Sequence, residues 1–171
     1  MSGSKPWVRL SWRLGEMALA IGALISLGGC MGSVPQPILP LDRRLEELGS
    51  SRAPSLAGPW LALISNSGGK DQVVLLNVDD QRPVPLPGLN RPDALPVSVA
   101  VEARGERLAV VRQLEGRTEL VLYRRPLMSS QLIPMNPPGV PRRVMVRADG
   151  RELAVEVSRD GHWQVDLIDI P

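Results

Sequence analysis

The chain has 171 residues, of which 43% are hydrophobic and 3% aromatic, with no phenylalanine. Its formal net charge is +2 at pH 7, and it has one cysteine and one histidine. A charge this small gives no electrostatic footprint for nucleic acid. One histidine with one cysteine cannot build the ligand set of a zinc site. The composition therefore argues against nucleic-acid binding and against a structural or catalytic zinc ion.

Residues 1–29 have the pattern of a secretory signal peptide. Lys5, Arg9 and Arg13 precede the uninterrupted apolar run "MALAIGALISL" of 11 residues. A helix needs about 20 apolar residues to span a bilayer, so this run is too short for a membrane span and has the length of a signal peptide's hydrophobic region. We expect residues 1–29 to be removed from the mature chain.

The signal ends in Leu27, Gly28, Gly29 and Cys30, which resemble the bacterial lipobox. Cys30 is the only cysteine, so it cannot form an internal disulfide. The resemblance implies a lipidated N-terminal Cys30, a membrane anchor, and a place in the bacterial cell envelope, facing the periplasm or the outer surface. An ordinary signal with an incidental cysteine, or an uncleaved anchor, is the alternative. Cleavage would leave 17 basic and 17 acidic residues, a mature net charge of zero.

Residues 30–57 are rich in Pro, Ser and Gly, which predicts a tether between the lipidated cysteine and the following domain. Within the tether, Leu41, Leu45 and Leu48 have helical spacing, with Asp42 in place to cap and Gly49 to end a short helix. A helix of about two turns is marginal by itself in water.

Residues 58–171 contain three copies of one apolar–turn–apolar unit, at 60–78, 107–125 and 152–170. Each copy starts with Leu-Ala, returns through a Val/Leu-x-Leu run, and has one glycine at the same place in its turn. The turn glycines Gly69, Gly116 and Gly161 are 47 and 45 residues apart. Alternating apolar residues on both sides of a glycine-bearing turn predict a β-hairpin. The chain thus repeats a hairpin three times.

The repeat extends beyond the hairpin on both sides. Alternating runs that end at Gly105 and Gly150 predict an extra inner strand before the second and third hairpins. Leu86-Pro87 and Ile133-Pro134 mark an outer strand, because proline is tolerated at a sheet edge. Four strands in about 45 residues are the pattern of a β-propeller blade. We therefore predict an all-β fold, a partial propeller of about three blades.

The runs "ADGRELAVEVSRDGHWQVDLIDI" and "ARGERLAVVRQLEGRTELVLYRR" resemble the repeat of the TolB family, whose propellers have six blades. The resemblance covers roughly residues 58–170 and implies blade architecture and a cell-envelope context. The first repeat fits less well, because Pro54 falls where an inner strand is expected. The N-terminal α/β domain of that family has no room in this chain. WD-type repeats fit worse, since their Gly-His and Trp-Asp pairs are missing.

No catalytic constellation is recognisable. His162 lies in a predicted turn, where an exposed polar residue is the usual finding. The chain has no G-x-S-x-G motif, and "SNSGGKD" lacks the spacing of a phosphate-binding loop. The aspartates are scattered over different repeats, so they do not form a calcium loop. We expect no enzymatic activity, no cofactor and no metal site.

The expected function is that of a non-catalytic envelope lipoprotein whose repeats bind another protein or an envelope component. The alternative is a ligand-binding sensor or an accessory propeller domain of an envelope enzyme. The third repeat ends at Ile170 without an outer strand, which leaves an unpaired sheet edge. We therefore expect a protein partner or self-association at open blade edges. One form of the latter is a dimer of three plus three blades, in which Ile38-Leu39 supplies the missing strand.

Overall fold

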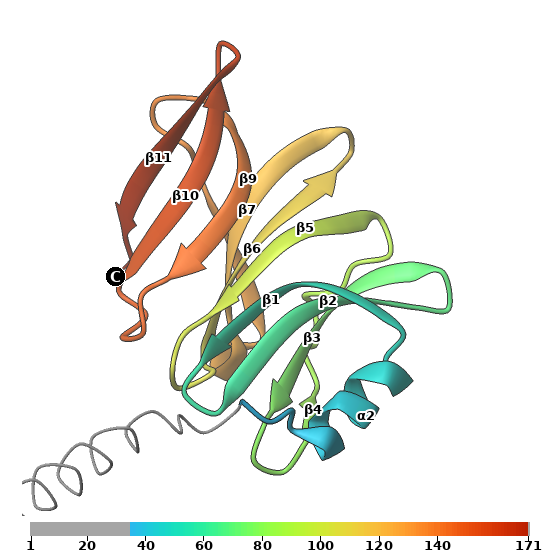
Figure 1. Ribbon diagram of the computed structural model, residues 1–171. Helices are drawn as coiled ribbons and strands as arrows, with labels where there is room; N and C mark the ends of the chain where they lie inside the picture. Colours follow the sequence, from blue (N-terminus) through green and yellow to red (C-terminus); the bar gives the residue numbers. More distant parts are fainter. Residues whose placement is uncertain (1–34, 171) are drawn as a thin grey trace, which may run out of the picture. The chain divides into compact units, whose positions relative to one another are not determined.

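The computed structural model describes residues 35–170, and the side chain of Ser67 is not included. The predicted signal peptide and Cys30 lie outside this range. Among the described residues, a helix is followed by three successive sheets (Figure 1), which confirms the predicted all-β partial propeller. The elements are α2 (Leu39–Glu47), β1 (Ser50–Ala57), β2 (Trp60–Ser67), β3 (Lys70–Asn77), β4 (Arg82–Val84), β5 (Ala94–Val101), β6 (Arg107–Leu114), β7 (Arg117–Arg124), a 3-10 turn η1 (Arg125–Leu127), β8 (Ser129–Ile133), β9 (Val140–Val146), β10 (Glu152–Arg159) and β11 (His162–Asp169).

Each sheet is one blade of antiparallel strands. Blade 1 has the order β1-β2-β3-β4, blade 2 the order β5-β6-β7-β8, and blade 3 the order β9-β10-β11. The hairpins β2/β3, β6/β7 and β10/β11 are those that the sequence predicts. Their two-residue turns, 68–69, 115–116 and 160–161, have positive φ at both positions. That conformation matches the right-handed twist of the flanking strands and favours glycine at the second position.

Blade 1 begins earlier than predicted. The sequence places the first repeat after residue 57, yet β1 is a full inner strand within the predicted tether. Pro54 is accommodated because the pairing of β1 with β2 shifts between Arg52 and Ser55, where Ala53 has a φ of +51°. An irregularity of this kind removes the need for the ladder hydrogen bond that proline cannot donate.

The outer strands also differ in detail from the prediction. In blade 2, β8 ends at Ile133, as the Ile133-Pro134 pattern indicates. In blade 1, β4 is only three residues long and ends before Leu86-Pro87. Leu86 instead turns inward and is buried in the core between blades 1 and 2. A short edge strand of this kind limits the number of unpaired backbone N–H and C=O groups at the sheet edge.

Helix α2 forms near the predicted leucines. Pro40 lies in its first turn, where a missing N–H costs nothing, and Gly49 follows its end with a φ of +83°. Asp42 lies in the first turn and makes no capping hydrogen bond. Since Ile38 is the N-cap residue and Leu39 is helical, the prediction that they form an outer strand is wrong. In the part of the chain described, no helix is long and apolar enough to cross a membrane.

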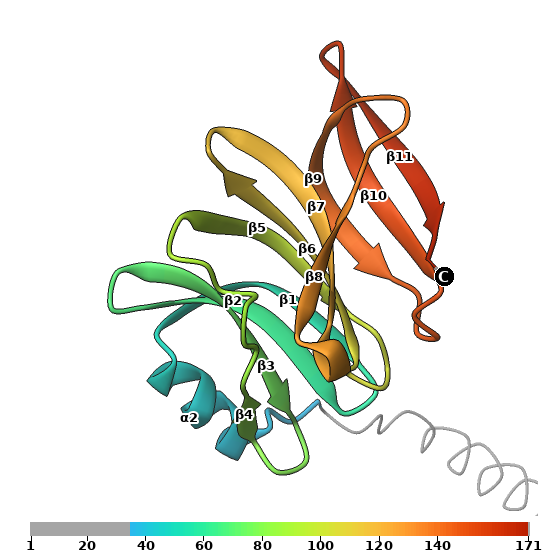
Figure 2. The same ribbon diagram turned by 180° about the vertical axis from the view of Figure 1, so that it is seen from behind.

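The core consists of layers between blades. One cluster lies between blades 1 and 2 and another between blades 2 and 3. Strand β6 of blade 2 contributes side chains to both clusters, because alternate side chains of a strand point to opposite faces of the sheet. Leu108 and Val110 join the cluster with blade 1, whereas Ala109 and Val111 join the cluster with blade 3. Figure 2 shows the same stack of blades from behind.

Candidate interaction surface

The outer face of blade 3, away from blade 2, carries a set of exposed apolar side chains. Strand pairing places Ala154 of β10 between Met145 of β9 and Leu167 of β11. Val165 and Trp163 extend the same row of β11. We call these five residues the blade 3 trough. The trough side chains of β11 are exposed by 59–79% and Met145 by 64%. Large apolar residues gathered in this way on one face mark an interaction site more often than scattered ones do.

The equivalent positions in the other blades are buried. Val165 and Leu167 follow the turn glycine at the same distances as Leu120 and Leu122 in blade 2 and as Val73 and Leu75 in blade 1. These four residues of blades 1 and 2 are at most 3% exposed. In both cases the next blade covers them. The exposure in blade 3 therefore arises because no further blade within residues 35–170 packs on this face, and not from a different sequence pattern.

Each blade has a second face, which we call its ridge. The ridge of blade 2 (Leu108, Val110) and that of blade 3 (Leu153, Val155) pack against the preceding blade. The corresponding residues of blade 1 are Leu61 and Leu63, and no blade precedes them among the described residues.

Helix α2 covers the blade 1 ridge instead of a blade. One cluster contains Leu41 and Leu45 of α2, its C-cap residue Leu48, and the ridge residues Leu61 and Leu63. One end of the stack is thus capped, and the trough end is open.

In the described part of the chain, blade 3 has three strands and no outer strand. In blade 1, β4 pairs with residues 75–77 of β3. In blade 2, β8 pairs with residues 120–124 of β7. Within the described residues, β11 pairs with β10 only. The N–H and C=O groups on the other edge of β11 have no strand partner, which makes this edge a template for an added strand.

A charged residue, Glu156, lies on the same face as the trough residues. Glu156 of β10 occupies the position that Val111 has in blade 2 and Ile64 in blade 1. Its cross-strand neighbours are Arg143 on β9 and Val165 on β11. A carboxylate here raises the cost of burying the face unless the occupant supplies a donor or leaves Glu156 partly in water. This charge also discourages nonspecific aggregation.

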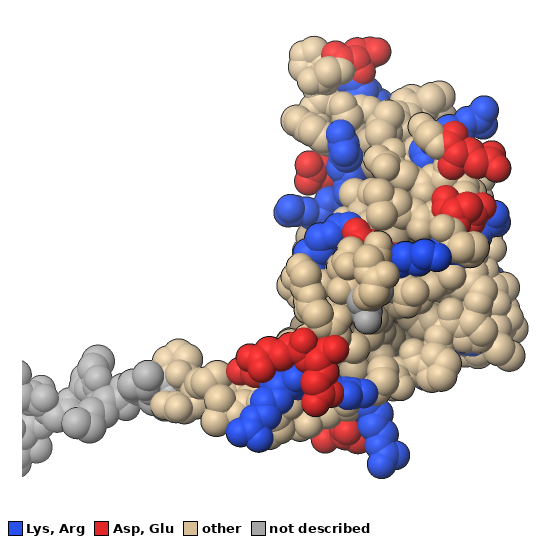
Figure 3. Space-filling view, turned by 90° about the vertical axis from the view of Figure 1, so that its right-hand side faces the viewer, with Lys and Arg blue, Asp and Glu red and all other residues tan. Residues whose placement is uncertain are grey.

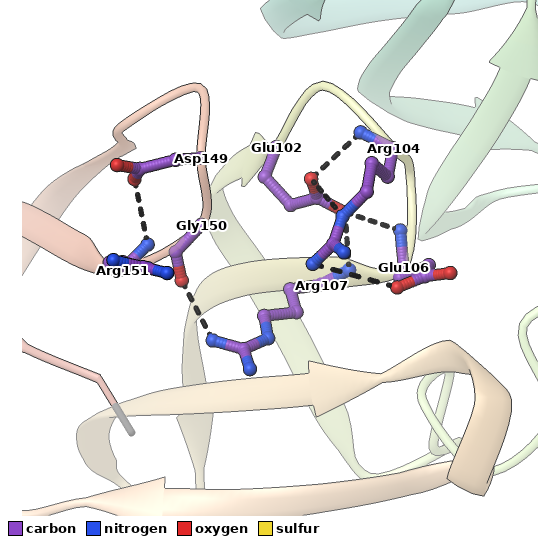
Figure 4. Close-up of polar contacts among 7 residues, drawn as sticks. All are labelled: Glu102, Arg104, Glu106, Arg107, Asp149, Gly150 and Arg151. Carbon is purple, nitrogen blue, oxygen red and sulfur yellow. Dashed lines mark hydrogen bonds and ion pairs between the residues drawn. The ribbon is translucent and has the colours of Figure 1, made fainter.

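The tight loops between the first and second strands of blades 2 and 3 are joined by a polar network (Figure 4). Glu102 is fully buried, and its carboxylate accepts hydrogen bonds from the backbone N–H groups of Arg104 (2.7 Å), Glu106 (2.7 Å) and Arg107 (3.3 Å). The guanidinium of Arg107 donates to the carbonyl of Gly150 at 2.9 Å. This network fixes one loop internally and ties it to the next blade.

The same loop positions carry opposite charges in the two blades. The loop of blade 2 reads "EARGER" and that of blade 3 reads "RADGRE". Matching backbone hydrogen bonds show that Glu102 and Arg147 are equivalent. Arg147 is 59% exposed and pairs with Asp149 and Glu152 of its own loop. The blade 2 loop therefore binds the next blade through Arg107 and Gly150, whereas the Arg147 side chain at the equivalent position of the blade 3 loop faces water.

A groove of about 770 Å³ runs along the inner strands β1, β5 and β9. Backbone N–H groups of one strand donate to serine hydroxyls of the preceding one: Val101 to Ser55 (3.1 Å) and Val144 to Ser98 (3.2 Å). Its only ionisable lining residues are Arg142 and Arg143. The groove offers volume and two positive charges, but no nucleophile paired with a base.

Ion pairs lower the pKa of three aspartates, Asp71, Asp93 and Asp166. The hydrogen bond from Arg159 lowers the pKa of Asp166 on β11, and the bidentate pair has a short contact of 2.5 Å. The hydrogen bond from Arg52 lowers the pKa of Asp71, with a smaller contribution from Asn66. Burial raises the pKa of Tyr123, whose hydroxyl donates to the carbonyl of Pro87. Asp71 lines a pocket together with Lys70, Arg91 and Asp93, and no histidine, cysteine or serine lines that pocket.

The residues singled out from the sequence lie at separate places. The turn glycines Gly69, Gly105, Gly116, Gly150 and Gly161 all have φ between +66° and +82°. His162 is the exposed first residue of β11, and its Nδ1 lies 3.1 Å from the carbonyl oxygen of Asp160. Leu27, Gly28, Gly29 and Cys30 lie outside the described residues. Within residues 35–170, no group of three or more His, Cys, Asp or Glu side chains could hold a metal ion.

Charged side chains of both signs are interspersed on the face shown in Figure 3. Neither positive nor negative side chains dominate that face. The face therefore offers no broad charged patch that would attract a polyanion by charge alone.

Comparison with solved structures places this arrangement among β-propellers. A match with TM-score 0.54 and 16% identity to TolB from Acinetobacter baumannii covers 69% of this chain and 29% of that one. The β-propeller domain of the Trilobed protease from Pyrococcus furiosus matches with TM-score 0.52 and 17% identity over 70% of this chain and 38% of that one. A prolyl endopeptidase matches with TM-score 0.50 and 14% identity over 92% of this chain and 26% of that one.

The described domain therefore has a β-propeller fold. More particularly, it has the fold of a partial TolB-type propeller. The chain spans between about a quarter and two fifths of the length of the matched chains. No family model matches the chain, and no curated protein sequence does.

Sequence reasoning predicted an open edge on the third repeat, but it did not identify the residues of the trough or the buried Glu102. The repeat alignment pairs Val165 and Leu167 with their counterparts, but it says nothing about which blade has a neighbour. The opposite charges of "EARGER" and "RADGRE" were the available signal for the loop network. Two loops that align in register with reversed charges indicate different surroundings for the same backbone.

Proposed function

We propose that this chain is a non-catalytic cell-envelope lipoprotein whose propeller-type blades form a protein-docking module. The observation that carries the docking proposal is the difference between Leu122 and Leu167, which hold the same repeat position yet are 0% and 79% exposed. The envelope location is supported by the basic and apolar N-terminus and by the lipobox-like Leu27–Cys30.

The trough supplies the physical basis for docking. Burying a Val, Leu or Met side chain contributes roughly 1.5–3 kcal/mol. Val165, Leu167 and Met145 are therefore the main apolar contributors available, and Trp163 is of the residue type that most often dominates an interface. The unpaired edge of β11 adds backbone hydrogen bonds to a partner that brings a strand.

A second candidate is a sensor that binds a small anionic ligand in the inner-strand groove. Its volume lies in the range of small-molecule sites, and Arg142 and Arg143 supply positive charge. This candidate predicts that Arg142→Ala with Arg143→Ala changes function while a trough substitution does not.

The anchor is tested in bacterial cells with the full chain and an alkyne-bearing fatty acid. The wild-type protein is expected to incorporate the label and to start at Cys30. Cys30→Ser is expected to remain unlabelled and unprocessed. An unmodified Cys30 in the mature wild-type protein, found by mass spectrometry, overturns the lipoprotein part of the proposal.

The docking surface is tested with a photo-crosslinking amino acid in place of Val165 or Leu132. Both residues are exposed and lie on the outermost strand of their blade, but Leu132 lies outside the trough. Adducts are expected at position 165 and not at 132. Equal yields at the two positions would show that the trough has no special role.

A further inference from the structure

We infer that the blade 3 trough receives the blade 1 ridge of a second copy of this chain, after helix α2 has moved off that ridge. Two copies related by a two-fold axis would then form two such contacts and close one ring of blades. This inference rests on the proposed docking function and names its partner. It gives α2 the role of a removable cap.

The first step is the repetition of one interface within the chain. The trough of blade 1 (Ala62, Val73, Leu75) holds the ridge Leu108 and Val110. The trough of blade 2 (Ala109, Leu120, Leu122) holds the ridge Leu153 and Val155. Blade 3 repeats the trough as Ala154, Val165 and Leu167, and blade 1 repeats the ridge as Leu61 and Leu63. The chain therefore carries both halves of a third interface, one at each end.

The second step is the symmetry of the arrangement. A ridge and a trough are different surfaces, so copies joined through them associate head to tail, and such contacts close when the rotation permits. Each chain supplies three blades, and two chains supply a number within the four to eight that closed propellers use. A two-fold ring leaves no trough open and no ridge free.

The third step is the weakness of the cap. Helix α2 has nine residues and no side-chain N-cap, and Leu41 is its one buried residue. A helix this short is unstable unless it is packed against other elements. A side-chain hydrogen bond ties the segment to blade 1, from the hydroxyl of Ser65 to the carbonyl of Leu48 at 2.5 Å.

The hinge for release is Gly49, between α2 and β1. It has a φ of +83°, and a Cβ there would lie 2.6 Å from the carbonyl oxygen of Asn66. Glycine permits this capped conformation and also permits many others. Rotation at Gly49 can therefore carry α2 away while β1 keeps its place in the sheet.

The exchange replaces one set of buried apolar side chains with another. Release of α2 exposes Leu41, Leu45 and Leu48, whereas docking covers the ridge again and buries Val165, Leu167 and Met145. The capped chain is a form in which the ridge is protected until a second copy is near. Anchoring on one membrane would raise the local concentration of copies.

The test uses the full chain in cell membranes, co-expressed with two different epitope tags. A photo-crosslinking amino acid replaces Leu167 in one copy, and peptide mass spectrometry locates the adduct. We expect an adduct with the second tag on β2 or β3, Trp60–Asn77, of the other copy. The variant Leu41→Asp, which weakens the cap, should raise the yield at least threefold. Leu39→Asp, at an exposed position of the same helix, should leave the yield unchanged.

Three outcomes overturn the inference. An adduct on blade 3 of the second copy, or on a different protein alone, excludes the ridge as occupant but leaves the proposed docking function intact. A yield that stays constant or falls in a folded Leu41→Asp protein, checked by its melting curve, excludes the cap. The absence of any adduct at Leu167 overturns the inference and the docking function together.

Discussion

The indole ring of Trp60 in blade 1 lies directly against Gly105 in the loop between β5 and β6 of blade 2. A Cβ at Gly105 would lie 2.5 Å from Cδ2 and Cε2 of that ring. The guanidinium of Arg125 stacks 4.8 Å from the ring centroid. Glycine is therefore required at residue 105 by a close approach between blades as well as by its positive φ.

Gly105→Ala should destabilise the domain more than Gly116→Ala. Both glycines have positive φ, +66° and +76°, but no atom lies within 4 Å of a Cβ at Gly116. Both variants incur the backbone strain, roughly 1–2 kcal/mol, and Gly105→Ala adds an overpacking cost of about 1–3 kcal/mol. Urea unfolding of the two variants measures the difference. Equal losses would mean that Trp60 moves away at no cost.

Glu102→Gln should lower the free energy of unfolding by about 1–3 kcal/mol. The carboxylate accepts three backbone N–H groups, whereas an amide would direct an NH₂ group at one of these donors. Glu106→Gln, at an exposed side chain of the same loop, is the matched control and should change stability by less than about 0.5 kcal/mol. Chemical denaturation at pH 7 compares the two. If Glu102→Gln left the free energy of unfolding unchanged, the result would contradict the assigned network.

Ser98→Ala should weaken the contact between blades 2 and 3. The hydroxyl of Ser98 accepts the buried N–H of Val144 at 3.2 Å, and its removal leaves that donor unsatisfied. The expected cost is about 1–3 kcal/mol. Amide hydrogen exchange at Val144 should become faster. Ser158→Ala serves as the control, because Ser158 on β10 makes no such bond among the contacts described. Similar protection of the Val144 amide in both variants would refute the hydrogen bond between Ser98 and Val144.

Asp166→Asn should remove a stabilising term that depends on pH. Arg159 lowers the folded-state pKa of Asp166 below its unfolded value of about 3.9, so the ion pair stabilises the folded state above that pH. The contribution is lost as pH falls from about 4 through the folded-state pKa. The melting temperatures of wild type and Asp166→Asn should therefore differ at pH 7 and converge near pH 2. A difference that persists unchanged in acid would assign the effect to packing.

Local pattern was sufficient for the three hairpins and their turns. Period-two runs around Gly69, Gly116 and Gly161 predict the hairpins, because side-chain alternation and the positive-φ turn are properties of a few neighbouring residues. The leucines at 41, 45 and 48 similarly predict α2. Pro54 led to the wrong boundary of blade 1, since a bulge that accommodates proline depends on the pairing strand and leaves no local signal.

Burial between blades could not be read from the sequence. Leu122 and Leu167 have equivalent neighbours along the chain, and only the stacking of blade 3 on blade 2 makes one buried and the other exposed. The same holds for Glu102 and Arg147, whose loops share a backbone hydrogen-bonding pattern but not a covering blade. The sequence by itself determined the repeating unit, because a hairpin is specified within about 20 residues. Only the tertiary structure decided that α2 caps one end and that the trough at the other end is open, because burial depends on which surfaces meet across the fold.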